Sequence, residues 1–588
     1  MAKRWDIRPT SDAAADLART IGLPAVVAHV LAQRGYTTAE SARAFLKPEL
    51  SQLHEPRALP GIIEAADRLV AAARSGEPIV IYGDYDVDGI TGSAILWQAL
   101  RLADANVRIY VPHRLEEGYG LNLEAVEKLA AEGAKVLVTV DCGISGVAET
   151  ARGRELGLDV IITDHHEPDP ALLPPAHILV DPKLPGSPYP FRELSGAGVA
   201  LKLAWAIGQK LSARDRVSEP FREFLVAATG LAALGTIADV VPLVGENHVL
   251  ASFGLRALAA SKHPGIAALR ETAGLTGREI DAYHIGFVLG PRLNAAGRLG
   301  HAREAVELLT TAGPDAALAI ARALDRQNRE RQEIEKQILD EADAQAAATF
   351  APERDAAIVL SAAGWHTGVI GIVASRIVEK YYRPTILIAA GEELAQGSGR
   401  SIAGFHLFEA LTACREHLKT FGGHAMAAGL RLPPAAVPAF REAFLAHAAK
   451  VISRDDLVPR LMVDAEASPT AFDVETVRVL DRLGPFGAGN PKPVFAAKKV
   501  RLTAPPRRIG QRGQHLAMHV TEGGRARRCV AWNLGETADA LGRAGACGIA
   551  YTCQVSTFSR LPEVELHLKD IWIGGYGDAK AAEEYKEL

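Results

Sequence analysis

The sequence predicts an α/β protein in which two α/β lobes are joined by one long helix and followed by a small β-barrel. Between residues 76 and 181, apolar β-prone runs alternate with helical stretches, which is typical of a doubly wound parallel sheet covered on both faces. Residues 314–348 contain no glycine and no second proline, which predicts a single helix. From about residue 460 onward, short strand-like runs alternate with turns, as in a small barrel.

The length of 588 residues is too great for one hydrophobic core, so we expect several domains. Their predicted limits are an N-terminal helical segment at 1–75, a first α/β domain at 76–313, the long helix at 314–349, a second α/β domain at 350–455, the barrel at 456–576 and a charged tail at 577–588. Hydrophobic residues make up 48% of the chain, which excludes global disorder. The net charge of −5 means that any nucleic-acid-binding surface is a local patch.

The sequence also predicts a cytoplasmic protein. The five cysteines show no paired metal-ligand spacing, which fits a reducing compartment. Met1–Asp6 lacks the apolar core of a signal peptide. Phe224–Val244 is almost entirely apolar, but two glycines, Asp239 and Pro242 interrupt it, so we expect a buried helix of a soluble protein rather than a membrane helix.

The predicted strands of the first domain are short and apolar, and they are Ile79–Tyr82, Val107–Val111, Val136–Val140, Val160–Thr163 and Ile178–Val180. Helices are expected at Gly92–Leu102, Leu123–Ala131 and Val147–Leu156, and residues 194–309 are mostly helical. In a sheet of this kind, ligands bind outside the carboxyl ends of the strands.

The long helix is predicted to be a solvated strut between two lobes, because Asp325–Glu333 contains no apolar residue. A coiled-coil arm is the alternative, although the heptads do not persist. The second domain is expected to have strands at Ala356–Leu360 and Thr385–Ala389 with a helix at Val369–Lys380. The glycine-rich stretch Gly397–Arg400 on its own indicates a plain turn.

Three carboxylates, Asp84, Asp86 and Asp88, follow the first strand at alternate positions. In an extended chain, residues two apart share one face, so these side chains would point the same way. A helix is expected to begin after them, at about Gly92. A metal-bound phosphate site and a solvated Asp-rich turn explain this stretch equally well when it is taken alone.

Later strand and helix ends repeat the arrangement, with Asp141, then Asp164 beside His165 and His166, then Asp181, and then Asp239. A single strand-end aspartate is usually a helix cap, but capping does not explain several of them with adjacent histidines. Carboxylates with a little imidazole suit Mn²⁺ or Mg²⁺ better than structural zinc. Two divalent ions would balance the charge and form the usual clamp for in-line displacement at phosphorus.

These motifs resemble the DHH phosphoesterase superfamily. The resemblance rests on Asp84–Gly92, Asp141-Cys142-Gly143, Asp164-His165-His166 and Asp239, in that order. Gly290–Gly300, Gly364–Gly371 and Gly422–His424 resemble the branch that consists of single-strand-specific 5′→3′ DNA exonucleases. The resemblance runs from about Arg57 to the end of the barrel, and it implies a DHH domain, a DHHA1 domain and a C-terminal OB-fold.

The resemblance implies a role for each residue of the site. The metal ligands would be Asp86, Asp88, Asp141, His165 and Asp239, with Asp141 between the two ions and Asp84 a further ligand or a residue behind the ligands. His166 would contact the scissile phosphate and help to protonate the leaving oxygen, and a packed structural imidazole is the alternative. Asp164 would orient the two histidines.

Further residues would act on the substrate. Arg298 would stabilise the transition-state charge with Asn294 as a second catalytic residue, and Arg292 would bind substrate. An interlobe salt bridge is the alternative for the two arginines. Ser398 and Arg400, together with Arg114, would bind the terminal 5′-phosphate, and His424 would reach the site from the second lobe unless it is a loop imidazole without a role.

The predicted barrel carries a local basic patch. Arg507, Arg508 and Arg512 would bind the strand, with Trp532 and His515 nearby. Because aromatic residues are sparse there, backbone contacts are expected to dominate over base stacking. A solvated charged face is the alternative for Arg525, Arg527 and Arg528.

The implied function is a metal-dependent exodeoxyribonuclease that uses two Mn²⁺ or Mg²⁺ ions to release 5′-mononucleotides from single-stranded DNA in recombination and repair. The implied partners of this monomer are a single-strand-binding protein and a RecQ-type helicase, and no membrane is involved. One alternative is a phosphodiesterase acting on oligoribonucleotides or cyclic dinucleotides, against which the barrel and the long helix argue. The other is a non-catalytic DNA-binding relative, against which the complete set of ligands argues.

Overall fold

The computed structural model describes residues 3–114, 116–556 and 561–576, so the predicted tail at 577–588 lies outside the described residues. Residue contacts divide the chain into two compact units. The first unit consists of Pro48–Asp340 and Pro485–Asn490, and the second of Met1–Lys47, Glu341–Gly484 and Pro491–Leu588. Residues 1–75, predicted as one segment, are divided between the two units.

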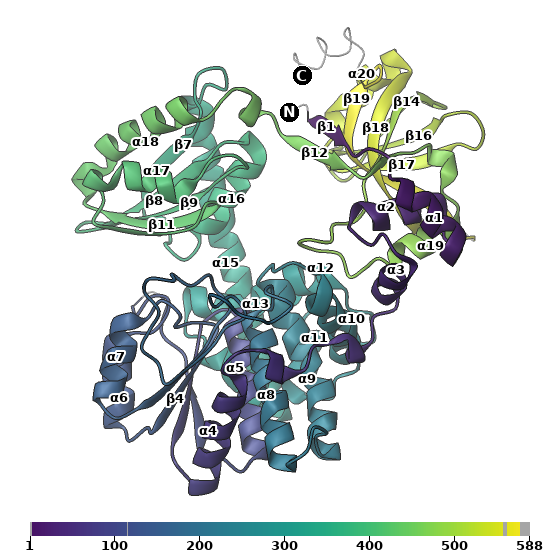
Figure 1. Ribbon diagram of the computed structural model, residues 1–588. Helices are drawn as coiled ribbons and strands as arrows, with labels where there is room; N and C mark the ends of the chain where they lie inside the picture. The colour runs from purple at the N-terminus through teal and green to yellow at the C-terminus, as the bar shows by residue number, and fades with distance from the viewer. Residues whose placement is uncertain (1–2, 115, 557–560, 577–588) are drawn as a thin grey trace. The chain divides into compact units, whose positions relative to one another are not determined.

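The first unit is built on a parallel sheet with the strand order β3-β2-β4-β5-β6. Its strands are β2 (Ile79–Gly83), β3 (Val107–Tyr110), β4 (Val136–Val140), β5 (Asp159–Thr163) and β6 (Ile178–Val180). One face is covered by α6 (Leu123–Ala131) and α7 (Val147–Glu155), and the other by α4 (Ile62–Ser75), α5 (Val87–Leu102) and α8 (Gly196–Ser212) (Figure 1). Burial on both faces explains the continuous apolar runs, and the predicted doubly wound sheet is confirmed.

The stretch after β2 differs from the prediction. The chain does not stay extended from Asp84 to Asp88, because α5 already begins at Val87. Asp86 caps this helix by accepting hydrogen bonds from the backbone N–H groups of Asp88 (2.9 Å) and Gly89 (3.1 Å). Gly89 does not delay the helix but permits close packing, since a Cβ there would lie 2.6 Å from the carbonyl oxygen of Asp84. The three carboxylates therefore come from a strand end, a cap and a first helical turn.

The rest of the first unit is helical, as predicted. It contains α9 (Glu219–Ala238), α10 (Gly245–Ala260), α11 (Pro264–Thr272), α12 (Ala282–His284), a π-helical turn (Ile285–Leu289), α13 (Gly290–Leu299) and α14 (Arg303–Thr310). In the described part of the chain, α9 is the one helix long and apolar enough to cross a membrane. It packs against α5, α8 and α10, and Ala228–Ile237 is buried. This helix is therefore part of the core.

A single helix, α15 (Pro314–Thr349), extends from the end of the first unit into the second. The middle of α15 was predicted to be solvated on all sides. This prediction is wrong for one face of the helix, on which Asp325, Asn328 and Arg331 are buried. These polar groups pair with each other and with neighbours: Arg331 donates to Asn328 (2.9 Å), and Asp325 pairs with Arg292 (2.9 Å). Absence of apolar residues therefore did not mean exposure to solvent.

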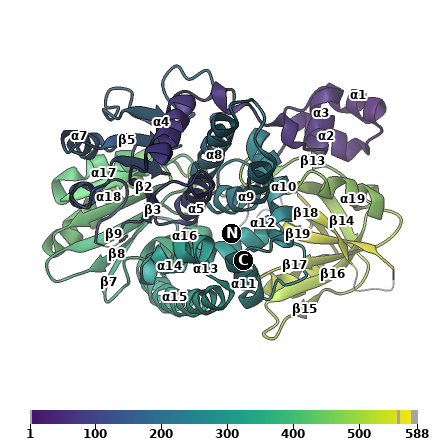
Figure 2. The same ribbon diagram turned by 90° about the horizontal axis from the view of Figure 1, so that it is seen from below.

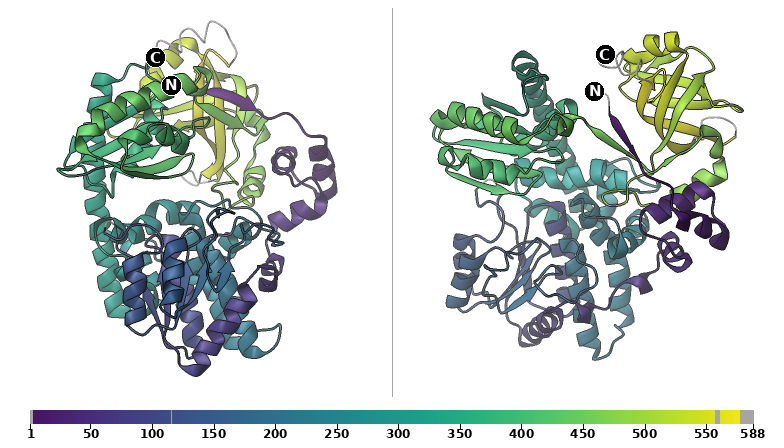
Figure 3. Two further views of the ribbon diagram at one scale, coloured as in Figure 1. Left: turned by 60° about the vertical axis from the view of Figure 1, so that its left-hand side comes forward. Right: turned by 45° about the horizontal axis from the view of Figure 1, so that its top comes forward.

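The second unit contains a smaller α/β lobe, drawn in green in Figure 3. Its strand order is β10-β11-β9-β8-β7. Its strands are β7 (Ile358–Ala363), β8 (Thr385–Ala390), β9 (Ala395–Arg400), β10 (Thr420–Gly423) and β11 (Ala427–Leu432). The helices α17 (Leu407–Ala413) and α18 (Val437–Val451) pack on one face, and α16 (Ile370–Tyr381) packs on β8 and β9. Gly397–Arg400 is not the turn that its glycines indicate but part of the internal strand β9.

The C-terminal part is a barrel that strand pairing closes, and Figure 2 labels its strands. Its strands are β14 (Phe495–Leu502), β16 (His515–Thr521), β17 (Arg527–Ala531), β18 (Ala546–Ser556) and β19 (Glu563–Ile573). They pair in the order β14-β18-β19-β17-β16, and β16 pairs again with β14. In chain order this is 1-4-5-3-2-1, the five-stranded Greek-key barrel of the OB-fold. Short strands β13 (Ala465–Glu466) and β15 (Arg507–Ile509) extend it, and α19 (Val474–Asp481) and α20 (Ala538–Ala544) pack against β18 and β19.

The N-terminal residues are not helical from the start. β1 (Arg4–Ile7) pairs in parallel with β12 (Arg460–Val463). Trp5 stacks on Tyr576 with a centroid distance of 4.3 Å and donates to Asp570 (2.7 Å). The helices α1 (Asp12–Ile21), α2 (Ala25–Gln33) and α3 (Ala39–Leu46) follow. The sequence did not predict this strand, because its partner, β12, is distant in the chain.

Candidate metal centre and nucleic-acid interface

The acidic site lies at the carboxyl edge of the parallel sheet in the first unit. β2, β4 and β5 are followed directly by Asp84, Asp141 and Asp164, and Asp239 caps the C-terminus of α9. Asp88 accepts hydrogen bonds from the backbone N–H groups of Gly196 (2.6 Å) and Ala197 (3.0 Å). The first turn of α8 therefore holds this carboxylate at its positive end.

Two glycines allow the helices to approach these carboxylates. A Cβ at Gly196 would lie 2.6 Å from the Cβ of Asp141, and one at Gly235 would lie 2.3 Å from Oδ1 of Asp88. Asp141 itself has a φ of 65°, a left-handed conformation that is uncommon outside glycine. The backbone therefore accepts strain at the residue that the resemblance places between two ions.

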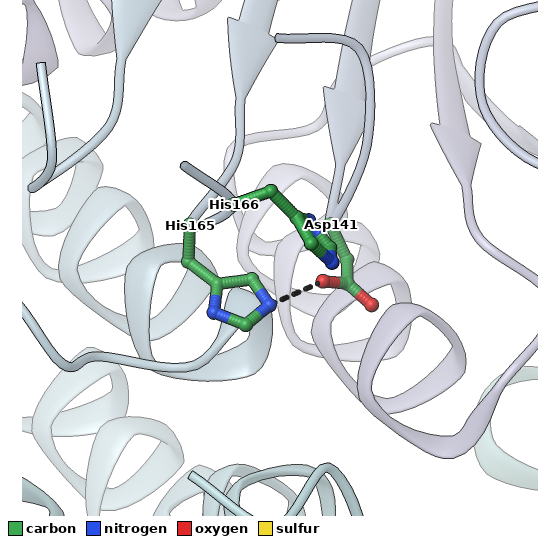
Figure 4. Close-up of side chains that lie close together, drawn as sticks. All are labelled: Asp141, His165 and His166. Carbon is green, nitrogen blue, oxygen red and sulfur yellow. Dashed lines mark ion pairs between the residues drawn. The ribbon is translucent and has the colours of Figure 1, made fainter. Parts of the chain in front are cut away.

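His165 joins the carboxylates into one cluster. Its Nε2 lies 3.0 Å from Oδ1 of Asp141, 3.5 Å from Oδ2 of Asp239 and 3.8 Å from Oδ2 of Asp88. Figure 4 shows the ring of His165 directed at Asp141, with His166 beside it. Three sets of side chains have ligand atoms within 4.8 Å of one another, and they are Asp84–Asp86–Asp141, Asp88–His165–Asp239 and Asp141–His165–His166. All six residues predicted as metal ligands thus come together.

The charges of this cluster are unbalanced. Burial, reinforced by neighbouring carboxylates, raises the pKa of Asp84 and Asp141 well above the usual range. The same causes raise the pKa of Asp88 to about 7 and that of Asp239 to about 8. Burial, together with the charge of His166, lowers the pKa of His165 to about 3, so its imidazole is neutral and one of its two nitrogens carries no proton and is available as a ligand.

A divalent cation fits the donor set. Among the described residues, Oδ1 of Asp84, Oδ1 of Asp141 and both ring nitrogens of His165 are buried without a hydrogen bond, since the 3.0 Å contact between Nε2 of His165 and Oδ1 of Asp141 does not have hydrogen-bond geometry. Buried polar atoms are almost always satisfied, so this convergence of unsatisfied carboxylate oxygens on a neutral imidazole calls for a positive charge. Oxygen-rich sets with one imidazole match Mn²⁺ or Mg²⁺.

A second histidine stands beside this cluster in a different environment. Nδ1 of His166 lies 2.7 Å from Oδ1 of Asp164, which also accepts from the backbone N–H groups of both histidines. Burial opposes the charged form of His166, but the hydrogen bond and charge of Asp164 outweigh it and raise the pKa of His166 to about 9. The hydrogen bond and charge of His166 outweigh burial in turn and lower the pKa of Asp164 to about 2.

Tyr119, which the sequence analysis did not single out, contacts this histidine through its hydroxyl. The sequence could have indicated this residue, because Gly118-Tyr119-Gly120 lies in the connection after β3, at the carboxyl edge of the sheet where ligands bind. Asp181, at the end of β6, is buried with its Oδ2 unpartnered among the described residues, and burial raises its pKa to about 7. It belongs to none of the three ligand sets.

The predicted substrate residues of the first unit have different surroundings. Arg114 lies over the ring of Tyr85 at 4.8 Å, and its charge acts on Asp84. Arg298 lies in the last turn of α13, where its charge acts on Tyr85. Arg292 is engaged by Asp325 of α15 (2.9 Å), which is an ion pair within the first unit and not one between lobes. Asn294 is half-buried on α13.

Ser398, Arg400 and His424 belong to the second unit. Arg400 donates to Oγ of Ser398 (3.1 Å). A Cβ at Gly371, at the start of α16, would lie 2.8 Å from this Oγ and 3.0 Å from the guanidinium of Arg400. The two side chains therefore lie at the N-terminus of α16, where a bound anion is favoured. His424 is exposed in the connection between β10 and β11.

Ion pairs neutralise several of the arginines that the sequence places on the barrel surface. Arg508 pairs with Asp539 (2.8 Å), Arg525 with Glu563 (3.0 Å) and Arg528 with Glu565 (2.8 Å), whereas Arg507 and Arg512 form no ion pair among the described residues. Trp532 is 55% exposed, and its ring centroid lies 4.7 Å from that of His515 and 6.4 Å from that of His567. Rings from β16, from β19 and from the residue after β17 thus lie together on the barrel, and the expectation that backbone contacts dominate over base stacking stays a prediction.

Comparison with known proteins agrees with this architecture. The model of the DHH family, N-terminal domain, matches residues 78–232, that of the DHHA1 domain matches 354–450, and that of the RecJ OB domain matches 463–570. The fold and the carboxylate–histidine centre are thus those of a DHH-family phosphoesterase.

The chain is 38% identical to the single-stranded-DNA-specific exonuclease RecJ of Bacillus subtilis over 570 residues, which cover 96% of this chain and 70% of that protein. It is 34% identical to RecJ of Escherichia coli over 584 residues, covering 97% and 98% of the two chains. The crystal structure of RecJ in complex with Mn²⁺ from Thermus thermophilus superimposes with a TM-score of 0.82 at 33% identity, covering 97% of this chain and 79% of that one. The chain belongs to the RecJ family of single-stranded-DNA-specific exonucleases.

Proposed function

We propose that this protein hydrolyses single-stranded DNA from the 5′ end and releases 5′-mononucleotides, using two Mn²⁺ or Mg²⁺ ions. The observation that carries the proposal is the buried cluster of carboxylates around His165, in which unsatisfied ligand atoms converge at the carboxyl edge of the sheet. Ions held by Asp84, Asp86, Asp88, Asp141, His165 and Asp239 would supply the charge that lowers the pKa of an attacking water and stabilises the phosphorane-like transition state.

His166 has the properties of a general acid in this reaction. Asp164 holds its Nδ1 at 2.7 Å, which leaves Nε2 for the substrate, and the pKa of about 9 keeps the ring protonated at neutral pH. It can therefore give a proton to the 3′ oxygen that leaves the phosphorus, while the paired Asp164 stabilises the charged ring. Arg298 and Asn294 would assist at the phosphate, and Arg114 would approach it from the connection after β3.

We also propose where the strand is bound. Ser398 and Arg400 at the start of α16 would hold the terminal 5′-phosphate, which sets the polarity, and His424 would assist. The barrel would hold the following nucleotides through Arg507 and Arg512, with Arg508 contributing only if it leaves Asp539, and through the exposed ring of Trp532. Arg292 is a weaker candidate, because its guanidinium is held in an ion pair by Asp325.

The cellular setting is a proposal of the same kind. The protein would be a cytoplasmic monomer that acts in recombination and repair with a single-strand-binding protein and a RecQ-type helicase. The five buried free cysteines support only the reducing compartment. The domain limits given from the sequence remain predictions.

The test uses 5′-labelled single-stranded and duplex DNA with Mn²⁺ present. Release of labelled 5′-mononucleotide from the single strand alone would support the proposal. Release from short oligoribonucleotides or cyclic dinucleotides in preference to long DNA would favour a small-substrate phosphodiesterase. Binding of the strand without hydrolysis, in protein that binds no Mn²⁺ by calorimetry, would favour a non-catalytic relative.

A further inference from the structure

The connection between β3 and α6 is built to hold one tyrosine over the metal centre. Tyr119 is flanked by Gly118 (φ 85°) and Gly120 (φ 86°), both in the left-handed region where other residues are strained. Among the described residues, no side chain or backbone atom fills the space beside either glycine within 4 Å of a built Cβ. The glycines therefore serve the backbone conformation rather than close packing.

Hydrogen bonds fix this connection on both sides of the tyrosine. The hydroxyl of Tyr82 donates to the carbonyl of Gly120 (3.1 Å). On the other side, the carboxylate of Glu117 accepts from the hydroxyl of Tyr110 (2.6 Å) and from the backbone N–H of His113 (2.7 Å). Tyr82 and Tyr110 belong to β2 and β3, so the sheet itself holds the connection in place.

The hydroxyl of Tyr119 is directed at the catalytic histidine. Its Oη lies 3.1 Å from Nδ1 and 3.2 Å from Nε2 of His166, and 3.5 Å from the carbonyl oxygen of Asp141. Because the ionised Asp164 can only accept, Nδ1 donates to it, and Nε2 is the nitrogen left for the tyrosine. The residue is 51% exposed, so it is not a core tyrosine that has found a partner.

We propose that Tyr119 is a positioning residue for His166. Asp164 holds the ring at Nδ1 and Tyr119 holds it at Nε2, so the imidazole is restrained from both ends until the leaving oxygen takes the place of the hydroxyl. The catalytic meaning of this restraint rests on the proposed function, but the contact itself does not. Two simpler roles compete with it: stacking of the ring on a base, and a purely structural role in the connection.

Two substitutions separate these roles. Tyr119→Phe keeps the ring and removes the hydroxyl, and Tyr119→Leu removes both. Loss of one positioning hydrogen bond is expected to lower kcat on single-stranded DNA about tenfold in both variants. KM and the Mn²⁺ titration should stay at the wild-type values. Tyr381→Phe, which removes a hydroxyl that donates to Asp343 (2.8 Å) in the second unit, is the matched control and should leave kcat unchanged.

A second readout does not depend on activity. In protein with ¹⁵N-labelled histidine, the ring signals of His166, assigned with His166→Gln, should shift in Tyr119→Phe and not in Tyr381→Phe. Unmoved ring signals in Tyr119→Phe would overturn the proposal even if the protein proved to have no nuclease activity. A wild-type kcat in Tyr119→Phe would also overturn it. A raised KM in Tyr119→Leu alone would assign the ring to base stacking, and a changed Mn²⁺ titration in Tyr119→Phe would assign it to the structure of the site.

Discussion

The variant Asp239→Asn tests the electrostatic account of the metal centre. Burial, together with Asp88 and Asp86, raises the pKa of Asp239 from 3.8 to about 8. An aspartate whose pKa is raised by folding contributes stability that is complete below its unfolded pKa and is lost as the pH rises toward its folded pKa, because the unfolded chain releases the proton first. The metal-free protein is therefore expected to lose stability between about pH 5.5 and about pH 8.

The magnitude follows from the pKa difference. One pKa unit corresponds to about 1.36 kcal/mol, so Asp239 alone makes the metal-free protein about 3 kcal/mol less stable at about pH 8 than at about pH 5.5. Asparagine cannot ionise, so the variant Asp239→Asn does not lose this stability and is more stable than the wild type at the higher pH. Added Mn²⁺ should stabilise the wild type at the higher pH more than it stabilises the variant, because a bound ion stabilises the folded state and the variant lacks one carboxylate ligand.

The assay is hydrogen exchange of the β4 and α5 amides in protein treated with EDTA, which reports the opening of the first unit by itself. Asp67→Asn removes an exposed carboxylate of the same unit and should follow the wild type at both pH values. If the metal-free wild type is equally protected at both pH values, or if Asp239→Asn loses protection in parallel with it, the carboxylates do not form the buried, mutually repelling cluster described above.

Four further outcomes are expected. In calorimetry, the wild type binds two Mn²⁺ ions, whereas Asp141→Ala loses at least one of them, because Asp141 belongs to two ligand sets. His166→Gln keeps Mn²⁺ binding, because the imidazole of His166 is protonated at neutral pH and is not a ligand, but it lowers kcat about 10²–10⁴-fold, as expected for loss of a general acid. Glu246→Gln lowers the free energy of unfolding by about 3–5 kcal/mol, because it leaves the buried ammonium of Lys202 without a counter-charge; in the wild type this ammonium lies 2.6 Å from Glu246. The double variant Lys202→Met/Glu246→Leu should recover most of the lost stability. Trp532→Ala weakens binding of single-stranded DNA by about 1–3 kcal/mol in fluorescence anisotropy.

Local patterns in the sequence were enough for the architecture and for the carboxylates and histidines that gather at one edge of the sheet. The strands from Ile79 to Val180 are continuous apolar runs because both faces of the sheet are buried, and parallel strands place their following residues at one edge. Asp84, Asp141 and Asp164 follow strands of that sheet, so their convergence could be expected. The conformation of Asp86 and Asp88 could not, because an N-cap and a first helical turn share the same residue types as an Asp-rich loop.

The sequence by itself determined the order of the domains and the carboxylates and histidines that gather at one edge of the sheet. Each of these depends on a residue and its near neighbours in the chain. Only the tertiary structure decided the state of each charged group. Arg292 is bound to Asp325, Arg508 is bound to Asp539, and His165 and His166 have pKa values on opposite sides of neutrality although they are adjacent. The physical reason is that burial and ion pairing depend on distances to side chains from distant segments, and composition and spacing do not contain those distances.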